Sequence, residues 1–564
     1  MTPKTTPASK REIPRAAARL LLATGLGEEE VIALLAPYGL ADPKRADANI
    51  QAMAGEPRSR GLLAQILDEL LASVGETADP DQALTYWERF LEAGVNRVQL
   101  FDYLRGFPRM LHLLCTIFGN SPAMAQTLIR DPLLVYWLAE TQVLVRRPTK
   151  LSLEQELRAM LANVGAMELK LDALRRFRRR QMLRIGIRDL LRLADVPETT
   201  AVLSDLAAVL IQAAYESVAA DLRGRYGIPV HRGAGGRSVE TGFAVIAMGK
   251  LGGGELNFSS DVDLIYVYGS DEGHTVGRSG STRTVSIPNE EYFEYLARDL
   301  TRALTEATQE GHVFRVDLRL RAEGSVGRLA RPLAGYAQYY RARGQTWERL
   351  ALLKAWPVAG DLRLGHTFLR AVRPFALGLR AGPETGEAEA VLEQVRAVKE
   401  MIDDKMALRG HERRNVKLGT GGIREIEFVV QAVQVLCGNR LPGIVNRGTL
   451  DSLSRFKLHG LLSGMEHDRL VRAYLFLRDV EHKLQMVHDL QTHALPEGAE
   501  ELTRCAIRLG YQAKDRREAM QRLAADYRRH TGSVNRVFRS LFYSPGRCPL
   551  LKAALAKKQR PGGK

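Results

Sequence analysis

The chain has 564 residues, of which 45% are hydrophobic and 26% charged, and its 81 Lys and Arg residues against 65 Asp and Glu residues give a net charge of +16. At roughly 150 residues per domain this length predicts three or four domains, and the apolar content is enough for buried cores, which excludes a disordered or fibrous protein. The sequence lacks both an uninterrupted apolar run of about 18 residues and a signal-peptide core near its first residue, so we expect neither membrane insertion nor secretion.

The excess positive charge is confined to three segments. Residues 1–20 carry a net charge of +4, residues 168–192 carry +6 and residues 546–564 carry six positive charges, so the remaining chain is neutral. Proteins that bind single-stranded nucleic acid interleave aromatic rings with basic residues, whereas Phe177 is the only aromatic residue in the central segment. We therefore do not expect nucleic-acid binding.

The cysteine pattern indicates the cellular compartment. The four cysteines, Cys115, Cys437, Cys505 and Cys548, are scattered without a C-x-x-C pair. This spacing indicates neither a disulfide framework nor a zinc site, and it fits a reducing environment. We therefore expect a cytoplasmic protein.

The first part of the chain predicts a basic tail followed by helices. Residues 1–13 lack apolar periodicity, whereas residues 14–165 show helical spacing interrupted by glycine and proline. Asp79-Pro80-Asp81 has proline between its acids and no apolar strand around it, so it indicates a turn or a helix cap. A second disordered basic tail is predicted over residues 546–564, and we expect both tails to be dispensable for activity.

A basic amphipathic helix is predicted from Leu174 to Leu193. Its apolar stripe comprises Leu174, Phe177, Leu183, Ile187, Leu190 and Leu191. Its arginines form either a solvated face or a surface that approaches phosphates or an acidic partner, and the sequence leaves both interpretations open. A second helix is predicted from Thr200 to Tyr226 and is followed by a glycine-rich loop.

The most informative stretch runs from Phe243 to Tyr268 and reads FAVIAMGKLGGGELNFSSDVDLIYVY. Residues 243–248 are apolar with a β-branched centre, which predicts a buried strand. The glycines that follow allow a sharp turn and the close approach of a ligand, and residues 255–260 leave room for about one helical turn. A second strand begins at Asp261, and because alternate strand residues share a face, Asp261 and Asp263 project together.

A third carboxylate lies in the alternating segment FRVDLRL, Phe314 to Leu320, where Arg315, Asp317 and Arg319 share one face. Mg²⁺ favours oxygen ligands and is usually held by one or two carboxylates together with substrate phosphates. Paired metal ions also stabilise both the attacking and the leaving oxygens of a displacement at phosphorus. We therefore assign three residues as metal ligands and catalytic groups, with Mg²⁺, or alternatively Mn²⁺, as the metal. They are Asp261, Asp263 and Asp317.

Helices are expected around this acidic centre. A polar loop, residues 270–288, leads to a helix that Asn289 is expected to cap and that runs to about Ala307. Another helix is predicted from Gly344 to Lys354. The loop Gly419 to Gly422 precedes the helix EIEFVVQAVQVL, and free amides at a helix N-terminus can hold a phosphate.

Other ligand motifs are absent from the sequence. A Walker A loop requires Ser or Thr after Gly-Lys, and here Leu251 follows Lys250; a G-x-G-x-x-G fingerprint is also absent from this turn. His482, His488 and His493 are six and five residues apart, which does not align them on one helix face. We predict no metal site at these histidines.

Four blocks, taken together, resemble the bacterial glutamine synthetase adenylyltransferase/adenylyl-removing enzyme family. They are GKLGGGELNFSSDVDLIYVY, RVDLRLRAEGSVG, WERLALLKAW and NVKLGTGGIREIEF, and the similarity extends in patches from about Ser121 to about Pro496. The Gly-Gly, Asp-x-Asp and later Asp are similar to the nucleotidyltransferase fold shared with DNA polymerase β. The resemblance implies a predominantly helical α+β protein, in which a mixed nucleotidyltransferase sheet is flanked by N- and C-terminal helical domains.

The resemblance also implies domain boundaries and binding residues. It places an N-terminal helical domain over residues 14–165, a nucleotidyltransferase domain over residues 166–374 and a C-terminal helical domain over residues 375–545. The residues expected to bind the nucleotide and its phosphates are Lys250, Gly252, Gly253, Ser260, Arg315, Arg319, Lys417 and Arg424. Glu348, Arg349 and Lys354 are similar to residues that the family keeps near its cleft, although a salt-bridged helix face explains them almost as well.

The resemblance has a direction. Family members usually carry an N-terminal half that removes AMP from glutamine synthetase and a C-terminal half that adds it, and this chain has one such motif, most similar to the N-terminal half. This implies phosphorolysis, in which phosphate attacks the AMP–tyrosine bond of glutamine synthetase to give ADP and free tyrosine. Two residues depart from the family pattern: Ala322 stands where proline usually follows Arg-Leu-Arg, and Trp356 stands where a basic residue commonly follows Lys-Ala.

Three alternatives remain open. The chain could transfer AMP forward from ATP to glutamine synthetase, transfer a uridylyl group to a PII signalling protein, or serve as a catalytically silent regulatory module. The intact carboxylates favour an enzyme over a silent module. Glutamine synthetase as substrate, a PII protein as regulator, and ATP or ADP as ligands are what the family resemblance implies.

Overall fold

The computed structural model describes residues 16–233, 235–277, 285–378, 386–408, 414–511 and 515–544. Both predicted tails and Cys548 lie outside these residues. Backbone contacts group the chain into two units, of which one comprises residues 1–145, 486–490 and 497–521 and the other comprises residues 146–485, 491–496 and 522–564. The division into three domains at residues 165 and 374 stays a prediction.

The first unit is helical in its described residues. Its helices are α1 (Arg19–Leu22), α2 (Glu28–Leu35), the 3₁₀ helix η1 (Ala36–Tyr38), α3 (Pro43–Ala54), α4 (Pro57–Gly75), α5 (Pro80–Glu92), α6 (Arg97–Gly106), α7 (Pro108–Asn120), α8 (Pro122–Arg130), α9 (Leu134–Ala139), α10 (Thr141–Val145) and α23 (Ala499–Arg508). Several begin at proline, whose fixed φ and missing N–H suit the first helical position. The Asp79 carboxylate accepts a hydrogen bond from the Gln82 amide at 3.0 Å, which confirms the helix cap predicted at Asp79-Pro80-Asp81.

Three buried aromatic rings lie at the core of the first unit. The ring centroids of Trp87, Phe90 and Phe118 lie 5.1–6.3 Å apart. The indole N–H of Trp87 lies 3.4 Å from Sγ of Cys115, a free and buried cysteine. Burial raises the pKa of the Cys115 thiol to about 12, so this cysteine packs as an inert apolar group.

The second unit contains helices and all the described strands. Its helices are α11 (Lys150–Leu161), α12 (Met167–Leu190), α13 (Val196–Tyr226), α14 (Gly249–Gly252), α15 (Asn289–Thr305), α16 (Leu333–Ala342), α17 (Thr346–Leu352), α18 (Leu362–Leu377), α19 (Gly386–Leu408), α20 (Ile423–Cys437) and α21 (Thr449–Leu458), with 3₁₀ helices η2 (Gly324–Val326) and η3 (Pro442–Ile444). Its strands are β1 (Ile228–Arg232), β2 (Ser238–Glu240), β3 (Phe243–Ala247), β4 (Val262–Tyr268), β5 (His274–Val276), β6 (Val316–Asp317), β7 (Ala330–Pro332) and β8 (Trp356–Gly360). Helices α22 (Gly464–His488) and α24 (Arg516–Tyr543) have residues in both units.

The strands form two small sheets. The smaller is antiparallel, in the order β2-β1-β5. The larger has the order β6-β4-β3-β8, in which β3 is antiparallel to β4 and β8, whereas β6 and β7 run parallel to β4 along the same edge. The larger sheet is therefore mixed, and the predicted class of a mostly helical α+β protein is confirmed.

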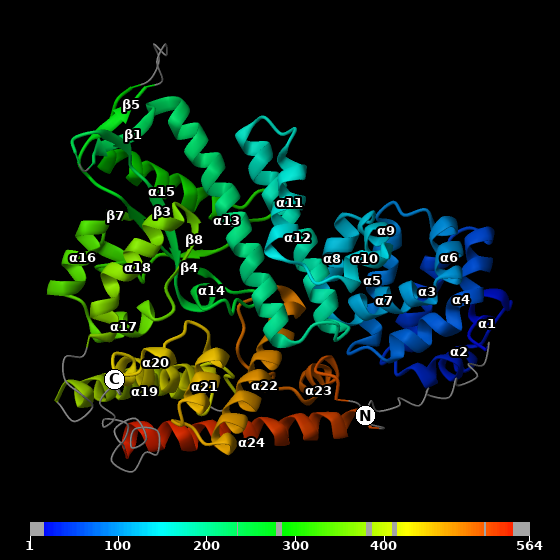
Figure 1. Ribbon diagram of the computed structural model, residues 1–564. Coiled ribbons are helices and arrows are strands. Elements are labelled where there is room, and N and C mark those ends of the chain that lie inside the picture. The colour runs from blue at the N-terminus through cyan, green and yellow to red at the C-terminus, as the bar shows by residue number, and fades with distance from the viewer. Residues whose placement is uncertain are drawn as a thin grey trace. The chain divides into compact units, whose positions relative to one another are not determined.

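Helices cover both faces of the larger sheet (Figure 1). On one face, Ile246 of β3 and Ile265 of β4 pack in a buried cluster with Phe368 of α18. On the other face, Phe243 of β3 stacks on Phe293 of α15, with 5.8 Å between ring centroids. The two-residue period of the strands thus supplies an apolar surface on each side of the sheet.

The turn between β3 and β4 differs from its prediction. The helical turn expected over residues 255–260 instead forms α14, directly after β3. The strand β4 begins at Val262, so Asp261 immediately precedes it. Because the Met248 amide donates to the carbonyl of Asp263 at 2.8 Å, the two strands stay paired up to the turn and the acidic residues lie beside it.

The strand that carries the third carboxylate is shorter than predicted. The predicted strand covers Phe314 to Leu320, whereas the observed strand β6 has two residues, which pair with β4. The chain turns after Asp317, where the Arg321 amide donates to the carbonyl of Leu318 at 3.2 Å. The rest of that edge of β4 is occupied by β7, which leaves no room for a longer β6.

Asn289 does not cap α15 as predicted. It is the first residue of the helix, and Pro288 occupies the cap position. Its buried amide nitrogen instead lies within 3.1 Å of three acceptors, the carbonyls of Val230 and Glu272 and the hydroxyl of Thr241. Asn289 therefore connects α15 to the smaller sheet.

The arginines of α12 resolve the interpretations left open by the sequence. Three of them are buried and form ion pairs within the second unit, namely Arg175 with Asp172, Arg184 with Glu156 and Arg188 with Glu198. In the predicted stripe, the residues up to Ile187 are buried, whereas Leu190 and Leu191 are partly exposed. Arg184 and Arg188 thus hold α12 against α11 and α13, Arg175 pairs within α12, and Arg176 is exposed.

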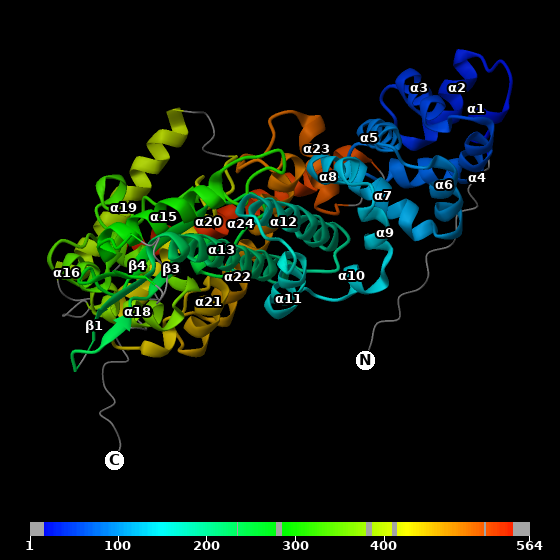
Figure 2. The same ribbon diagram turned by 90° about the horizontal axis from the view of Figure 1, so that it is seen from above.

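Helix α13 is the one helix in the described part of the chain whose length and composition would suit a membrane span. Its most apolar window of 18 residues has a mean hydropathy of 1.3, and 61% of that window is buried inside the protein. Figures 1 and 2 both show α13 lying beside α12. Packing within the second unit therefore accounts for its apolar surface.

Buried ion pairs join the larger sheet to the C-terminal helices of the second unit. The ammonium of Lys354, a residue that is 5% exposed, lies 3.1 Å from Glu255 and 2.9 Å from Glu427 of α20. The ammonium of Lys250 in α14 lies 2.8 Å from the buried carboxylate of Glu481 in α22. These pairs, which we call the buried ion network, hold the turn after β3 against α20 and α22.

We expect Lys354→Met to lower the free energy of unfolding at pH 7 by about 3–5 kcal/mol in urea denaturation, because it leaves two buried carboxylates without a counter-ion. Burial alone would raise the pKa of Glu427, but the Lys354 and Arg424 charges hold it well below its ordinary value. A carboxylate with a lowered pKa stabilises the fold above the unfolded-state pKa of about 4.3 and loses this contribution as the pH falls. The deficit of the variant should therefore shrink below about pH 4.3.

Lys150→Met is the matched control for this measurement. Lys150 belongs to the same unit, is 46% exposed and lies 4.0 Å from Glu154. Its loss should change stability by less than about 0.5 kcal/mol, as is usual for an exposed pair. Equal losses in the two variants would show that the buried ion network does not hold the second unit together.

Candidate active site

A cavity of about 880 Å³ lies in the second unit, between the acidic end of the larger sheet and helices α17, α19 and α20. Most of the predicted site residues line it, namely Lys250, Ser260, Asp261, Asp263, Asp317, Arg319, Lys417 and Arg424. The remaining three, Gly252, Gly253 and Arg315, do not. Residues more than 150 positions apart in the sequence thus meet at one cavity.

Two of the predicted carboxylates are held side by side by strand pairing. Asp263 of β4 is directly opposite Asp317 of β6 in the parallel register. Asp261 lies two residues before Asp263 and therefore projects to the same side of the sheet. The alternation that suggested a shared face brings all three carboxylates to the wall of the cavity.

Arginines contact two of these carboxylates. The guanidinium of Arg315 donates to Asp261 at 2.7 Å, and the guanidinium of Arg319 donates to Asp317 at 2.5 and 2.9 Å. The hydrogen bonds from Arg319 lower the pKa of Asp317, which keeps this carboxylate ionised. Arg315 and Arg319 therefore neutralise Asp261 and Asp317, respectively.

Asp263 has no such arginine partner among the residues that the structure describes. Burial raises its pKa to about 6, and the negative charge of Asp317 adds to the shift, while Lys417 and Arg424 oppose it. A divalent cation between the carboxylates would remove this repulsion, so the oxygen donors suit Mg²⁺ or Mn²⁺ in chemical type. With Asp261 and Asp317 turned toward their arginines, no three acidic, histidine or cysteine side chains among the described residues surround a common metal position.

The glycines of the turn after β3 serve packing. Gly249 has φ +53°, and a Cβ there would lie 2.2 Å from Oδ2 of Asp263. A Cβ at Gly252 would lie 2.1 Å from the carbonyl oxygen of Lys354. Gly249 thus makes room for the carboxylate of Asp263, whereas Gly252 lets the segment before β8 approach the turn and stays away from the cavity wall.

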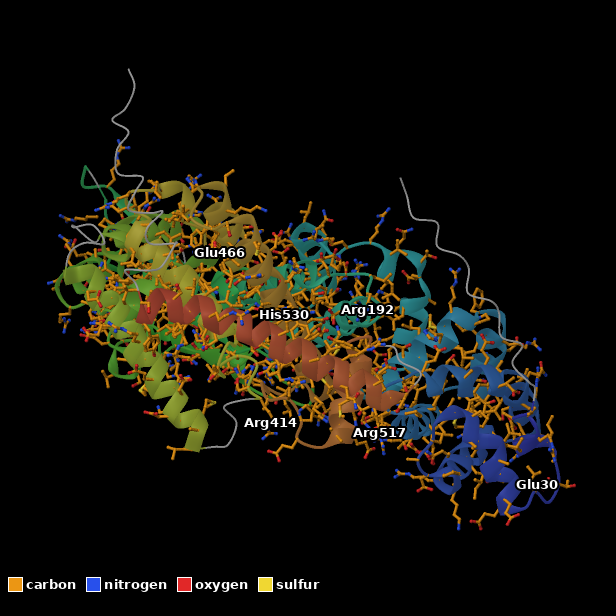
Figure 3. All side chains as sticks on the ribbon, turned by 90° about the horizontal axis from the view of Figure 1, so that it is seen from below. Glu30, Arg192, Arg414, Glu466, Arg517 and His530 are labelled. Carbon is orange, nitrogen blue, oxygen red and sulfur yellow. The ribbon has the colours of Figure 1, made fainter. Side chains whose placement is uncertain are left out.

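A second glycine loop, Gly419 to Gly422, also has a packing role. Gly421 has φ +73°, and a Cβ there would lie 2.0 Å from the carbonyl of Thr531 in α24. Nearby, His530, which is labelled in Figure 3, stacks its ring on Phe476 of α22 with 4.6 Å between centroids. The close approach of α24 therefore explains the glycine at position 421, and the predicted phosphate contact of this loop stays a prediction.

Two cations of the same segment face the cavity. Arg424 lies at the start of α20, 3.7 Å from Glu427, with its guanidinium above the ring of Phe428. Burial and the neighbouring Arg424 charge lower the pKa of Lys417. Lys417 has an ammonium group that forms no ion pair with any residue that the structure describes. It is therefore the cation of the cavity wall that most needs an anionic ligand.

Lys250 is occupied by a different partner. Its ammonium donates to both carboxylate oxygens of Glu481 at 2.8 and 2.9 Å. Burial lowers the pKa of Lys250 to about 7, although the Glu481 carboxylate opposes this shift. Nδ1 of His493 lies 2.9 Å from the carboxylate of Glu481. One of the three histidines that do not share a helix face therefore still supports the site, through Glu481.

Sequence patterns did not reveal the other wall of the cavity. The helices that complete the cavity wall contribute Trp347 and Leu350 of α17, Val395 of α19, and Phe428 and Gln431 of α20. Local spacing does not identify Glu427 as a cavity residue either, although it lies in the EIEF block of the family resemblance. Lys354 was noted only as similar to cleft residues, and its position between two buried carboxylates could not be inferred from local spacing.

The two residues that depart from the family pattern lie away from the cavity wall. Ala322 is 1% exposed and belongs to the cluster between the sheet and α16 and α18. Trp356 begins β8, and the guanidinium of Arg447 lies 4.3 Å from its ring centroid. Arg447 also donates to the carbonyl of Gly252 at 2.8 Å, so another part of the chain supplies a basic group beside Trp356.

Two family models match the chain in separate segments. Residues 110–371 match the model described as glutamate-ammonia ligase adenylyltransferase. Residues 396–542 match the model described as PII-uridylyltransferase. The first segment contains the larger sheet and its three carboxylates, and the second contains α20, α21 and α22.

Curated relatives give a consistent picture. A bifunctional glutamine synthetase adenylyltransferase/adenylyl-removing enzyme of Nitrosococcus oceani is 36% identical over 437 residues, which cover 78% of this chain and 43% of the relative. The enzyme of the same name from Rhizobium meliloti is 40% identical over 346 residues, which cover 60% of this chain and 33% of the relative.

A third relative with this name, from Thioalkalivibrio sulfidiphilus, is 38% identical over 432 residues, which cover 77% of this chain and 42% of the relative. The chain thus spans less than half the length of the curated relatives it matches. The family model and the names of these relatives confirm the resemblance seen in the sequence motifs. Residues 110–371, with the carboxylates of the cavity, therefore match the glutamate-ammonia ligase adenylyltransferase family model.

Proposed function

We propose that the chain is a metal-dependent protein nucleotidyltransferase that acts on glutamine synthetase and removes AMP from an adenylylated tyrosine by phosphorolysis. One observation carries this proposal: Asp263 and Asp317 face one another across paired strands while Lys417, a cation without an ion pair in the described residues, lines the same cavity. Carboxylates that hold a divalent cation, with free cations beside them, are the arrangement that phosphoryl transfer requires.

We propose a polymerase β-like fold for this part of the chain. The order strand β3, glycine turn, strand β4, helix α15 and strand β6 supports it, with two carboxylates at the start of β4 and one on β6. The mixed sheet with helices on both faces is compatible with this fold. In this proposal the sheet holds the metal ion, and the turn before α20 contacts the phosphates.

In the proposed reaction, an oxygen of inorganic phosphate attacks the phosphorus of the AMP–tyrosine phosphodiester. The bond from that phosphorus to the tyrosine oxygen breaks, the phenolate takes up a proton, and the products are ADP and tyrosine. Bound Mg²⁺, held by Asp261, Asp263 and Asp317, would supply charge stabilisation to the attacking and leaving oxygens. Arg315, Arg319, Lys417 and Arg424 would offset the repulsion between the two anionic reactants.

In this proposal Arg315 and Arg319 each change from a carboxylate partner to a phosphate partner. Each now pairs with a carboxylate, and a bound cation would free both guanidinium groups for phosphate oxygens. Arginine suits that role because its planar donors match phosphate geometry. The ion pairs seen here thus fit a site whose ligands arrive together.

The alternative reactions use the same carboxylates and differ in their substrates. The match of residues 396–542 to a PII-uridylyltransferase model supports uridylyl transfer to a PII protein as the second candidate. Forward transfer from ATP to glutamine synthetase would use the same carboxylates. The names of the relatives support glutamine synthetase as the substrate, and the match to a PII-uridylyltransferase model supports a PII protein as a regulator.

Product analysis separates these candidates. The full chain is incubated with adenylylated glutamine synthetase, Mg²⁺ and phosphate, and in parallel with the unmodified enzyme and ATP, and with a PII protein and UTP. We expect ADP and unmodified tyrosine in the first reaction alone. Adenylylation or uridylylation in the other reactions without ADP formation in the first would overturn the preferred direction.

Asp263→Asn should abolish turnover while the protein stays folded. Loss of one metal-binding carboxylate should lower the rate by at least about 10²–10³-fold, as is typical for removing one transition-state stabiliser. Asp271→Asn, at the exposed loop after β4, is the matched control and should leave both the rate and the melting temperature unchanged. Near-normal activity of a folded Asp263→Asn protein would contradict the assigned role.

Asp317→Asn tests which role the third carboxylate plays. The attacking phosphate is already anionic at pH 7, so phosphorolysis needs no base and Asp317 would act through metal binding. Part of the lost activity should then return when Mn²⁺ replaces Mg²⁺, because Mn²⁺ accepts mixed ligand sets more readily, and the rate should show no new rise at high pH.

In forward transfer the attacking tyrosine, with a pKa near 10, must lose its proton, and the carboxylate can be its base. A variant that stays inactive with every metal yet recovers toward about pH 10 would therefore identify a forward adenylyltransferase.

A further inference from the structure

We infer that Gln431 reads the base of the bound nucleotide and selects adenine, by accepting a hydrogen bond from the 6-amino group in the apolar part of the cavity. The inference rests on the proposed function, because it assigns the part of the same cavity that is left for the nucleoside. It explains how a chain that matches both an adenylyltransferase and a uridylyltransferase model would distinguish the two nucleotides.

The cavity wall has charged and apolar parts. The sheet, the turn after β3, the segment before α20 and the start of α20 supply its charged residues. Helices α17, α19 and α20 also supply the apolar side chains Leu350, Val395 and Phe428, each less than 9% exposed. Trp347, which is 40% exposed, adds an aromatic ring to the apolar part. A volume of about 880 Å³ is large enough for a nucleotide, so an apolar base at this part is consistent with phosphates beside the carboxylates.

The orientation of the Gln431 amide is determined by its neighbour. Gln431 is 8% exposed, and its amide nitrogen donates to the backbone carbonyl of Leu350 at 3.2 Å. A carbonyl oxygen can only accept, so the nitrogen end must face Leu350. The carbonyl end of Gln431 is thereby left to accept, and no described residue donates to it.

A fixed acceptor discriminates among bases. Adenine carries an amino group at position 6 and cytosine one at position 4, whereas guanine and uracil present carbonyl oxygens there. A buried acceptor that meets another acceptor loses its hydrogen bond and leaves two polar groups desolvated. Gln431 would therefore favour adenine over guanine and uracil.

The other amides at the cavity are weaker candidates. Gln394 and Gln491 line it but are exposed, and neither side chain is fixed by a hydrogen bond to a described residue. A free amide can rotate to offer either end, so it cannot distinguish an amino group from a carbonyl. Gln431 is the amide whose donor end is already engaged.

The test measures equilibrium binding to the full chain by calorimetry in the presence of Mg²⁺. The probes are ADP, UDP and purine riboside 5′-diphosphate, which is ADP without its 6-amino group. We expect wild-type protein to bind ADP about tenfold more tightly than either other probe. Gln431→Met, which keeps the length of the side chain but removes the acceptor, should bring ADP and purine riboside diphosphate within about twofold of each other.

Gln434→Met is the matched control. Gln434 lies on the same helix, is also buried and donates to Asn446 and Ser452 outside the cavity. Its loss should lower the melting temperature and leave the tenfold preference intact, which separates base reading from a structural role. Should Gln431→Met fail to fold, the comparison of ADP with purine riboside diphosphate on wild-type protein still decides.

Each result has a definite meaning. Equal affinity of wild-type protein for ADP and purine riboside diphosphate overturns the inference while leaving the proposed function in place. A preference that survives in folded Gln431→Met also overturns it. The absence of ADP binding altogether contradicts the proposed function itself, and with it this assignment.

Discussion

The second unit depends on charges that are buried in pairs. Removing charged groups from water is costly unless each finds a partner, and Lys354 finds two, Glu255 and Glu427. Glu255 also accepts hydrogen bonds from the amide and the hydroxyl of Thr449, so both the carboxylate and the ammonium of this pair are held by several contacts. A core of this kind specifies one arrangement of the glycine turn against α20 and tolerates few others.

The three carboxylates of the cavity could be predicted from the sequence because their geometry is local. Asp261 and Asp263 share a face by the two-residue period of a strand, and β6 needs only one register to bring Asp317 opposite Asp263. The buried ion network has no local pattern, since Lys354 and Glu427 are 73 residues apart and Lys250 and Glu481 are 231 apart. Such pairs form only when the topology of the whole unit is set.

Glycines and strand ends show the other limit of prediction. A glycine in a sequence indicates that something approaches the backbone closely, but it does not indicate what. At Gly252 and Gly421 the neighbours are the carbonyls of Lys354 and Thr531, where a ligand had been expected. The length of β6 was equally hidden, because it depends on competition with β7 for one edge of β4, and β7 follows it in the chain.

Helix α20 is enclosed on nearly all sides. Fourteen of its fifteen residues are buried, and it packs against α17, α18, α19 and α21. Most of these buried residues are apolar, and its buried Glu427 and Gln431 have partners on neighbouring segments, so removing those neighbours would expose apolar surface and leave buried polar groups without partners. Expression boundaries for a shorter protein therefore cannot be placed between the sheet and the C-terminal helices: a fragment ending after α18 or beginning at α19 would expose the surfaces that this helix joins.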